Sequence, residues 1–145
     1  MSEVLRLAKN QDRRLRAGHL WIYSNEVDND ATPLKSFAPG QVVDIENAAG
    51  RWLGRGYVNP NSLICGRLVT RDAAVAIDVS LFIHRIKVAL AMRERMYATP
   101  FYRLVFGEAD GLPGLVVDRY GDYLALQLST AGMDAQREGL IAALI

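Results

Sequence analysis

The first half of the chain alternates between apolar and polar positions in short runs, a pattern typical of β-strands that bury one face. These runs cover 4–8, 20–23, a hairpin over 41–58 that turns at 47–50, and 63–70. One short helix is predicted over 11–17, and Gly18 ends it. Gly54 and Gly56 fall inside a predicted strand, where glycine indicates a bend or a close backbone approach. Five short strands and a small helix predict a compact β-barrel, which closes its strand edges.

The second half changes to a helical period that is followed by more strands. Asp78 or Ser80 can cap a helix running to about Ala98, and Pro100 prevents its continuation. Its apolar face is predicted to hold Val79, Phe82, Ile83, Ile86, Ala89, Leu90 and Tyr97. Apolar runs at 104–106, 115–117 and 123–128 then predict an antiparallel β-meander with glycine-containing turns. A last helix over 133–145 ends on uncapped hydrophobic residues, so we expect the chain to be truncated there.

Arg93 interrupts the apolar face of the long predicted helix. A guanidinium buried at that position needs a carboxylate partner, because an unpaired buried charge is costly. Glu108, Asp110 and Asp118 are the candidates in the turns of the meander. We predict that one of them pairs with Arg93 and fixes the helix on the strands.

Charge and cysteine content indicate which partners and which cellular compartment to expect. The formal charge is only +1, from 17 basic and 16 acidic residues, so global charge predicts no polyanionic partner. Locally, residues 51–71 hold four arginines and no acid, whereas residues 107–122 hold four acids and one arginine. The single cysteine excludes an intramolecular disulfide, and no signal peptide or long apolar segment is recognisable. These features predict a cytoplasmic protein without membrane association.

Residues suited to catalysis are scarce. His19 and His84 are the only histidines, and they show no metal-ligand spacing with Cys65. Cys65 lies in an apolar strand, where a buried structural thiol is expected rather than a nucleophile. The sequence Gly-Arg-Gly at 54–56 continues into a strand instead of opening a helix, unlike a nucleotide-binding fingerprint. We therefore predict no catalytic residue, no metal and no bound cofactor in this chain.

Basic and aromatic residues indicate RNA binding instead. Arginine gives bidentate contacts to phosphate, and an exposed aromatic ring can stack on an unpaired base. The basic residues lie around the first helix and in the strand region, with Trp21, Tyr23, Trp52 and Tyr57 among them. The alternative is that these aromatic residues belong to the core and that the arginines are ordinary surface residues.

Three ordered segments resemble a known family. They are RRLRAGHLWIYSNEV at 13–27, GRGYVNPNSLICGRLVTRD at 54–72 and GEADGLPGLVVDRYGD at 107–122. Together they resemble the RlmI-type 23S rRNA cytosine-C5 methyltransferases. The resemblance implies an N-terminal PUA RNA-binding domain and, in the full-length protein, a later Rossmann-type domain that uses S-adenosylmethionine and carries the nucleophilic cysteine.

The resemblance also implies a domain organisation within an α+β fold class. We expect a PUA-like β-barrel at 1–72, a linker at 73–77, and a central α+β domain at 78–145 with a helix packed on the meander. This fragment would position 23S rRNA of the large ribosomal subunit for a catalytic domain outside it, and would itself be inactive. The alternatives are a stand-alone RNA-binding adaptor without enzymatic activity, or a protein-interaction role for 78–145. The oligomeric state stays open, with a homodimer as one alternative.

PUA domains, as the resemblance implies, contact RNA through the first helix, the strand after it and a nearby glycine loop. Combined with the basic residues of the strand region, this gives the predicted RNA-binding set: Lys9, Arg13, Arg14, Arg16, His19, Gly40, Gln41, Arg51, Arg55, Arg67 and Arg71.

Overall fold

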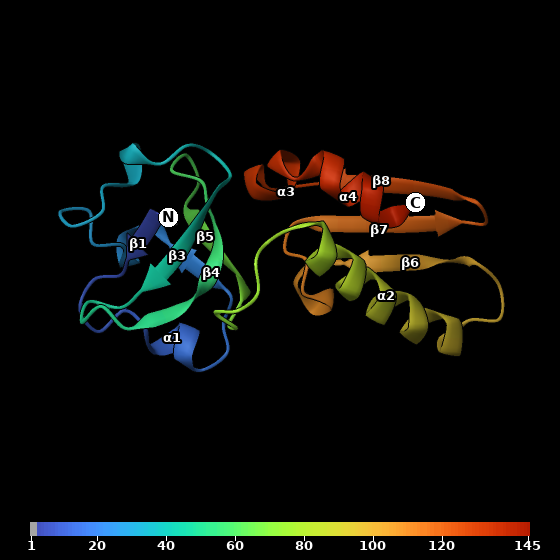
Figure 1. Ribbon diagram of the computed structural model, residues 1–145, viewed down its shortest axis with the longest axis horizontal. Helices are drawn as coiled ribbons and strands as arrows, with labels where there is room; N and C mark the ends of the chain where they lie inside the picture. The colour runs from blue at the N-terminus through green and yellow to red at the C-terminus, as the bar shows by residue number, and fades with distance from the viewer. Residues whose placement is uncertain (1–2) are drawn as a thin grey trace. The chain divides into compact units, whose positions relative to one another are not determined.

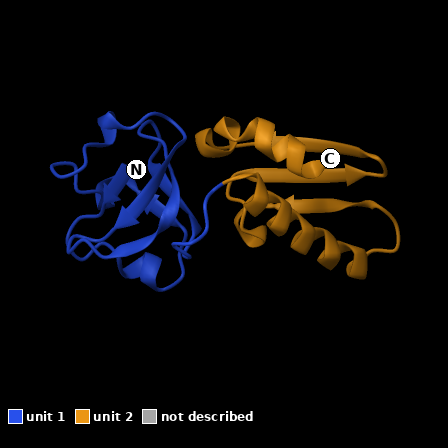
Figure 2. Ribbon diagram, in the orientation of Figure 1, with its two compact units in different colours: residues 1–77 blue, residues 78–145 orange. Residues whose placement is uncertain are grey.

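The computed structural model describes residues 3–145, which fold as two compact units. The first covers residues 1–77 and the second residues 78–145 (Figure 2). Each unit has its own sheet, and the two sheets hold five and three strands. No helix among residues 3–145 is both long enough and apolar enough to cross a bilayer.

The first unit is a mixed five-stranded sheet with one short helix (Figure 1). Its elements are β1 (Glu3–Arg6), α1 (Arg13–Arg16), β2 (Trp21–Tyr23), the 3-10 turns η1 (Ser24–Glu26) and η2 (Leu34–Ser36), β3 (Gln41–Glu46), β4 (Trp52–Val58) and β5 (Ile64–Thr70). The strand order is β1-β3-β4-β5-β2. Strand β1 pairs with β3 in parallel, and the other pairs are antiparallel.

The expected closure of this sheet into a barrel is not found in the strand pairing. Strands β1 and β2 stand at opposite ends of the strand order, and no ladder joins them among the described residues. A single antiparallel bridge between Leu7 and Val27 connects the two edges, supported by a hydrogen bond of 2.9 Å from the Ala8 N–H to the Glu26 carbonyl. The reason is local: β2 has three residues and turns into η1 before a longer ladder can form. The α+β class is confirmed.

The core of the first unit lies on the inner face of this sheet. Leu5, Val43 and Ile45 are completely buried, as their alternation in the sequence predicts. Where strands β4 and β5 approach closely, only glycine leaves enough room for the neighbouring strand. A Cβ atom on Gly56 would overlap the carbonyl oxygen of Arg67, and one on Gly54 would overlap the Leu68 side chain. The predicted close backbone approach is therefore confirmed.

The second unit places helices on one face of a three-stranded antiparallel sheet. Its elements are α2 (Val79–Met96), β6 (Phe101–Phe106), the 3-10 turn η3 (Gly107–Asp110), β7 (Leu115–Tyr120), β8 (Tyr123–Leu128), α3 (Ala131–Ala135) and α4 (Arg137–Leu144), with strand order β6-β7-β8. Asp78 caps α2, because its carboxylate accepts a hydrogen bond from the Leu81 N–H at 3.1 Å. The expected last helix is divided into α3 and α4 at Gln136.

Helices α2 and α4 pack against each other and cover one face of this sheet (Figure 1). Phe82 and Leu140 from the helices are fully buried, as are Leu115 and Val117 from β7. The predicted face of α2 is partly wrong: Leu81 is buried, whereas Val79 and Tyr97 at the two ends are exposed. No helix of residues 78–145 covers the other face of the sheet (Figure 1).

Arg93 makes the predicted ion pair, with Asp110. Two guanidinium nitrogens donate to the two carboxylate oxygens at 3.1 and 2.9 Å. The side chains are 14 % and 6 % exposed. Asp110 also accepts a hydrogen bond of 2.7 Å from the Phe106 N–H, and Arg93 donates to the Arg103 carbonyl at 3.1 Å. This acidic residue of the 107–122 segment therefore fixes helix α2 to the turn after β6.

Candidate nucleic-acid interface

Helix α1 presents arginines on both sides of one buried anchor. Its sequence is Arg-Arg-Leu-Arg, and Leu15 is buried in the core of the first unit. Arg13, Arg14 and Arg16 are consequently directed away from that core and are exposed. Gly18 ends the helix with a φ of +110°, a value that glycine adopts without strain.

Arg14 and Arg16 make long ion pairs in which the arginine is exposed and the carboxylate is largely buried. Arg14 lies 3.6 Å from Glu26, and its guanidinium is 5.1 Å above the ring of Tyr23. Arg16 lies 3.8 Å from Asp12, one helical turn before it. The two arginine side chains are 56 % and 60 % exposed. The partner carboxylates of Glu26 and Asp12 are only 8 % and 14 % exposed. At distances of 3.6 and 3.8 Å neither pair has the geometry of a short, bidentate ion pair, so the exposed guanidinium groups keep donors that can reach a phosphate.

Two other predicted residues are brought next to α1. The turn between β3 and β4 is attached to the start of the helix by a 3.3 Å hydrogen bond from Asn47 to Asp12, and the Arg51 N–H donates to the side chain of the same Asn47 at 2.9 Å. Arg71, after β5, donates to the His19 carbonyl at 3.0 Å. Both arginines are exposed. We call this region the basic α1 surface, and it consists of Lys9, Arg13, Arg14, Arg16, His19, Arg51 and Arg71.

The predicted glycine loop lies away from this surface. Gly40 and Gln41 are at the beginning of β3, whereas the turn beside α1 follows its end. The six residues of β3 lie between Gly40 and that turn, which corresponds to roughly 20 Å. Gly40 is buried and donates its N–H to the Val58 carbonyl at 2.8 Å. This hydrogen bond continues the pairing of β3 with β4, so Gly40 has a structural role at the end of the sheet.

Arg55 contacts other groups of the protein through its guanidinium and stabilises the fold. It lies on β4, and its guanidinium donates to Asp44 at 2.9 Å and to the Val75 carbonyl of the segment after β5. The Arg55 and Asp44 side chains are 17 % and 18 % exposed. These contacts hold the segment that leaves the sheet. Arg67, on β5, lies 5.1 Å above the ring of Trp21, its register partner on β2.

Cys65 is a buried thiol in β5, as the sequence predicts. It is 1 % exposed, and its sulfur lies 3.6 Å from the Ile22 carbonyl. Burial is the main cause that raises the pKa of this thiol to about 11. A thiol with such a pKa is almost entirely protonated near neutral pH, so Cys65 is not suited to nucleophilic attack.

The Gly-Arg-Gly segment at 54–56 does not fit a nucleotide or S-adenosylmethionine cradle. It lies in the middle of β4, which is paired on both sides with β3 and β5. The space that a ligand would need beside Gly54 and Gly56 is filled by Leu68 and the Arg67 backbone. These glycines serve the packing of the sheet.

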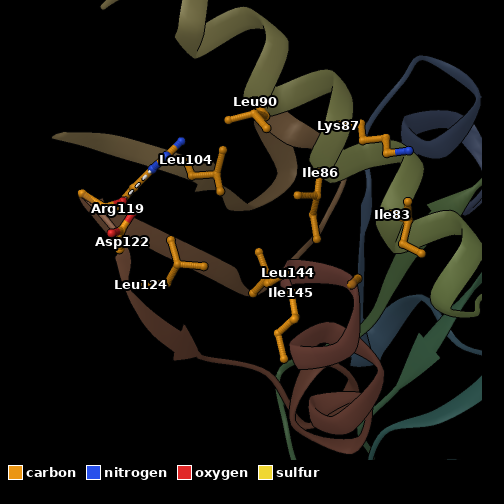
Figure 3. Close-up of a pocket in the computed structure, with 12 residues that line it drawn as sticks. Ile83, Ile86, Lys87, Leu90, Leu104, Arg119, Asp122, Leu124, Leu144 and Ile145 are labelled. Carbon is orange, nitrogen blue, oxygen red and sulfur yellow. Dashed lines mark hydrogen bonds between the residues drawn. The ribbon is translucent and has the colours of Figure 1, made fainter. Parts of the chain in front are cut away.

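The second unit contains an apolar groove of about 400 Å³ on the helix-covered face of its sheet. Figure 3 shows Leu104 and Leu124 from the sheet and Ile86 and Leu90 from α2 around this space. Its charged residues are Lys87, Arg119 and Asp122. The residues that line the groove include no nucleophile with an adjacent base, so they do not form a catalytic constellation.

Comparison with known proteins assigns the first unit. The family model of the PUA-like domain matches residues 5–71, which run from the second half of β1 to the end of β5. The first unit is a PUA-like domain. The match contains the segment at 13–27 and all but the last residue of the segment at 54–72, and it confirms the expected PUA-like domain.

The similarity extends over both units. The chain is 39 % identical to ribosomal RNA large subunit methyltransferase I of Cronobacter sakazakii, and 40 % identical to the protein of the same name from Citrobacter koseri. Each alignment covers 99 % of this chain but 36 % of the relative. The chain therefore spans about a third of the length of the relatives it matches.

Solved structures show the same fold across both units. A protein assigned as a methyltransferase, crystallised with S-adenosylhomocysteine, matches with a TM-score of 0.81 at 21 % identity. A protein from Streptococcus mutans assigned as a SAM-dependent methyltransferase matches with a TM-score of 0.80, also at 21 % identity. Both cover 98 % of this chain, and the chain covers 36 % and 37 % of them. At this identity the likeness supports the fold.

Proposed function

We propose that this chain is the RNA-binding N-terminal portion of an S-adenosylmethionine-dependent 23S rRNA (cytosine-C5) methyltransferase. The observation that carries the proposal is 39–40 % identity over 99 % of the chain to ribosomal RNA large subunit methyltransferases, and residues 5–71 of this chain match a PUA-like domain. In this proposal the chain holds the rRNA, and the part of the full-length protein outside these residues binds the cofactor and carries out the transfer.

The basic α1 surface is the proposed site of contact with the RNA backbone. Arg13, Arg14 and Arg16 project from a single turn around Leu15, and Arg51 and Arg71 flank that turn. Guanidinium groups make bidentate contacts with phosphate oxygens. Such contacts release counterions, so their contribution to affinity depends on salt. They position an RNA helix but do not read its sequence, because every nucleotide carries the same phosphate. The Arg14 and Arg16 side chains are more than half exposed and lie 3.6 and 3.8 Å from their carboxylates, which leaves donors for phosphate.

The test is RNA binding by this chain as a function of salt concentration. Fluorescence anisotropy with a labelled RNA hairpin should show affinity that falls linearly with the logarithm of salt concentration. The double substitution R13A/R16A removes two of the proposed contacts. It should lower the salt slope by nearly two and reduce the affinity by about tenfold more at 50 mM than at 200 mM salt. R95A is the matched control, since it removes an exposed arginine from the end of α2 in the second unit.

Two results would contradict this proposal. One is that the wild-type chain binds no RNA, or binds it with no dependence on salt. The other is that the control R95A weakens binding as much as R13A/R16A does. Calorimetry adds a separate check: we expect no stoichiometric binding of S-adenosylmethionine to residues 1–145, and such binding would overturn the division of roles between this chain and the rest of the protein.

A further inference from the structure

The face of the β6–β7–β8 sheet opposite helices α2 and α4 presents a row of aromatic rings. Phe101, Tyr120 and Tyr123 are register partners across the three strands. Their side chains are 61 %, 55 % and 80 % exposed. The alternation of β7 explains the placement: Leu115 and Val117 point into the core, so Tyr120 points to the opposite side. We call this row, with Arg103 and Phe106 on the same side, the aromatic sheet face.

The row next to the rings on this face holds a charged pair. Arg103 pairs with Asp118, its register partner, through two hydrogen bonds of 2.8 and 3.2 Å. The Arg103 guanidinium also lies 5.4 Å above the ring of Phe106. Gln127 of β8 is exposed on the same side, opposite Val116. Rings that can stack thus alternate with groups that can donate to and accept from the edges of bases.

The width of the apolar strip distinguishes between two kinds of partner. A protein interface has an apolar core that is surrounded by a polar rim. Here the aromatic row is one residue wide along each strand, and the row beside it is Arg103, Asp118 and Ala125. Neighbouring rings in such a row have Cβ atoms about 5 Å apart. A single file of exposed rings on a sheet is the arrangement that stacks successive unpaired bases.

The charge of this face is compatible with a polyanion. The hydrogen bonds from Arg103 lower the pKa of Asp118, and the same contact raises the pKa of Arg103, so both groups stay ionised and cancel each other near neutral pH. The pair uses Nε and Nη2 of Arg103. Its side chain is 44 % exposed, which leaves Nη1 available to donate to a phosphate or a base.

We propose that the aromatic sheet face binds unpaired nucleotides of the RNA by stacking their bases on Phe101, Tyr120 and Tyr123. The inference rests on the proposed function, because the ligand is a single-stranded part of the RNA that the basic α1 surface holds. It adds a second contact of different chemistry. Binding at this face depends on stacking, so it should change little with salt, in contrast to binding at α1.

The experiment compares two RNA probes and one substitution. The probes are a short blunt duplex and the same duplex with a single-stranded extension. Tyr123 is on an edge strand and is the most exposed of the three rings, so Y123A should leave the fold intact. We expect Y123A to weaken binding of the extended probe at least about fivefold, which corresponds to about 1 kcal/mol. Binding of the blunt duplex should be unchanged.

Three controls separate base stacking from phosphate contact and from structural damage. Y123F keeps the ring and should restore binding of the extended probe. The ratio between wild type and Y123A should stay the same from low to high salt, whereas the ratio for R13A/R16A should shrink. Ultraviolet crosslinking of the extended probe followed by peptide mass spectrometry should place a crosslink in β6, β7 or β8.

The outcomes distinguish this inference from the function proposed above. If wild type binds neither probe, the proposed RNA function is wrong. If wild type binds both probes but Y123A binds the extended one as tightly as wild type does, the stacking site is wrong and the RNA function stands. A wild-type dimer in sedimentation that Y123A dissociates would also overturn the inference, since it would identify the face as a contact between protein chains.

Discussion

The basic α1 surface and the aromatic sheet face use arginine in opposite ways. On α1 the arginines are exposed, and the ion pairs of Arg14 and Arg16 reach 3.6 and 3.8 Å. On the sheet face Arg103 is held against Asp118 by two short hydrogen bonds. The first arrangement leaves positive charge for a polyanion, and the second leaves a neutral surface on which rings dominate. We therefore expect the partners of each guanidinium, rather than the number of arginines in a segment, to decide the affinity of that segment for RNA.

The largest expected effect on stability comes from substituting Arg93 of helix α2, which has the most complete set of partners among the arginines discussed. R93A would leave Asp110 buried without its bidentate partner. Breaking a buried pair in this way costs about 3–5 kcal/mol, so the free energy of unfolding of the second unit should fall by about that amount. Urea denaturation followed by circular dichroism measures the change. The matched variant R13A, on the exposed helix α1, should change stability by less than about 0.5 kcal/mol. Equal losses in the two variants would remove the contrast.

The sequence predicts best the features that depend on neighbouring residues. The cap at Asp78, the turn at 47–50 and the pairing of Arg93 with a carboxylate all follow from short patterns. The separation of Gly40 from helix α1 could not be predicted, because it depends on which end of β3 each segment joins. The open edges of the first sheet depend on the length of β2 for the same reason.

The row of aromatic rings could not be predicted from the sequence either, because it depends on how three strands pair. Phe101, Tyr120 and Tyr123 are inconspicuous in the sequence. Phe101 begins β6 and Tyr120 ends β7, so nearly the whole of two strands and the turn between them separate these two residues. Only the register of β6, β7 and β8 shows that they are partners. A partial signal was present, since β7 alternates between buried Leu115 and Val117 and exposed Tyr120. That alternation identifies an outward position on one strand but not its neighbours on the others.

Arg55 provides an intermediate test, because the sequence places it in the RNA-binding set and the structure surrounds it with protein partners. R55A removes the ion pair with Asp44 and the hydrogen bond to the Val75 carbonyl. Because the pair is largely buried, we expect a loss of stability of about 2 kcal/mol and little change in RNA affinity. R16A should do the reverse, with weaker RNA binding and nearly unchanged stability. Thermal unfolding and fluorescence anisotropy on the same preparations measure both. A large loss of RNA affinity in folded R55A would show that Arg55 contacts RNA after all.

The smallest expected effect comes from converting the neutral face into a basic one. D118N removes the carboxylate that neutralises Arg103 and leaves its guanidinium on the aromatic sheet face. One additional cation on a single strand increases the salt slope by about 0.7, so the affinity for the extended probe should gain roughly threefold at 50 mM relative to 200 mM salt. E138Q is the control, since it removes one negative charge from the exposed surface of helix α4, which covers the other face of the sheet. If D118N leaves the salt slope unchanged while the protein stays folded, RNA does not reach Arg103. The face would then have to bind its bases at the Phe101–Tyr123 end alone.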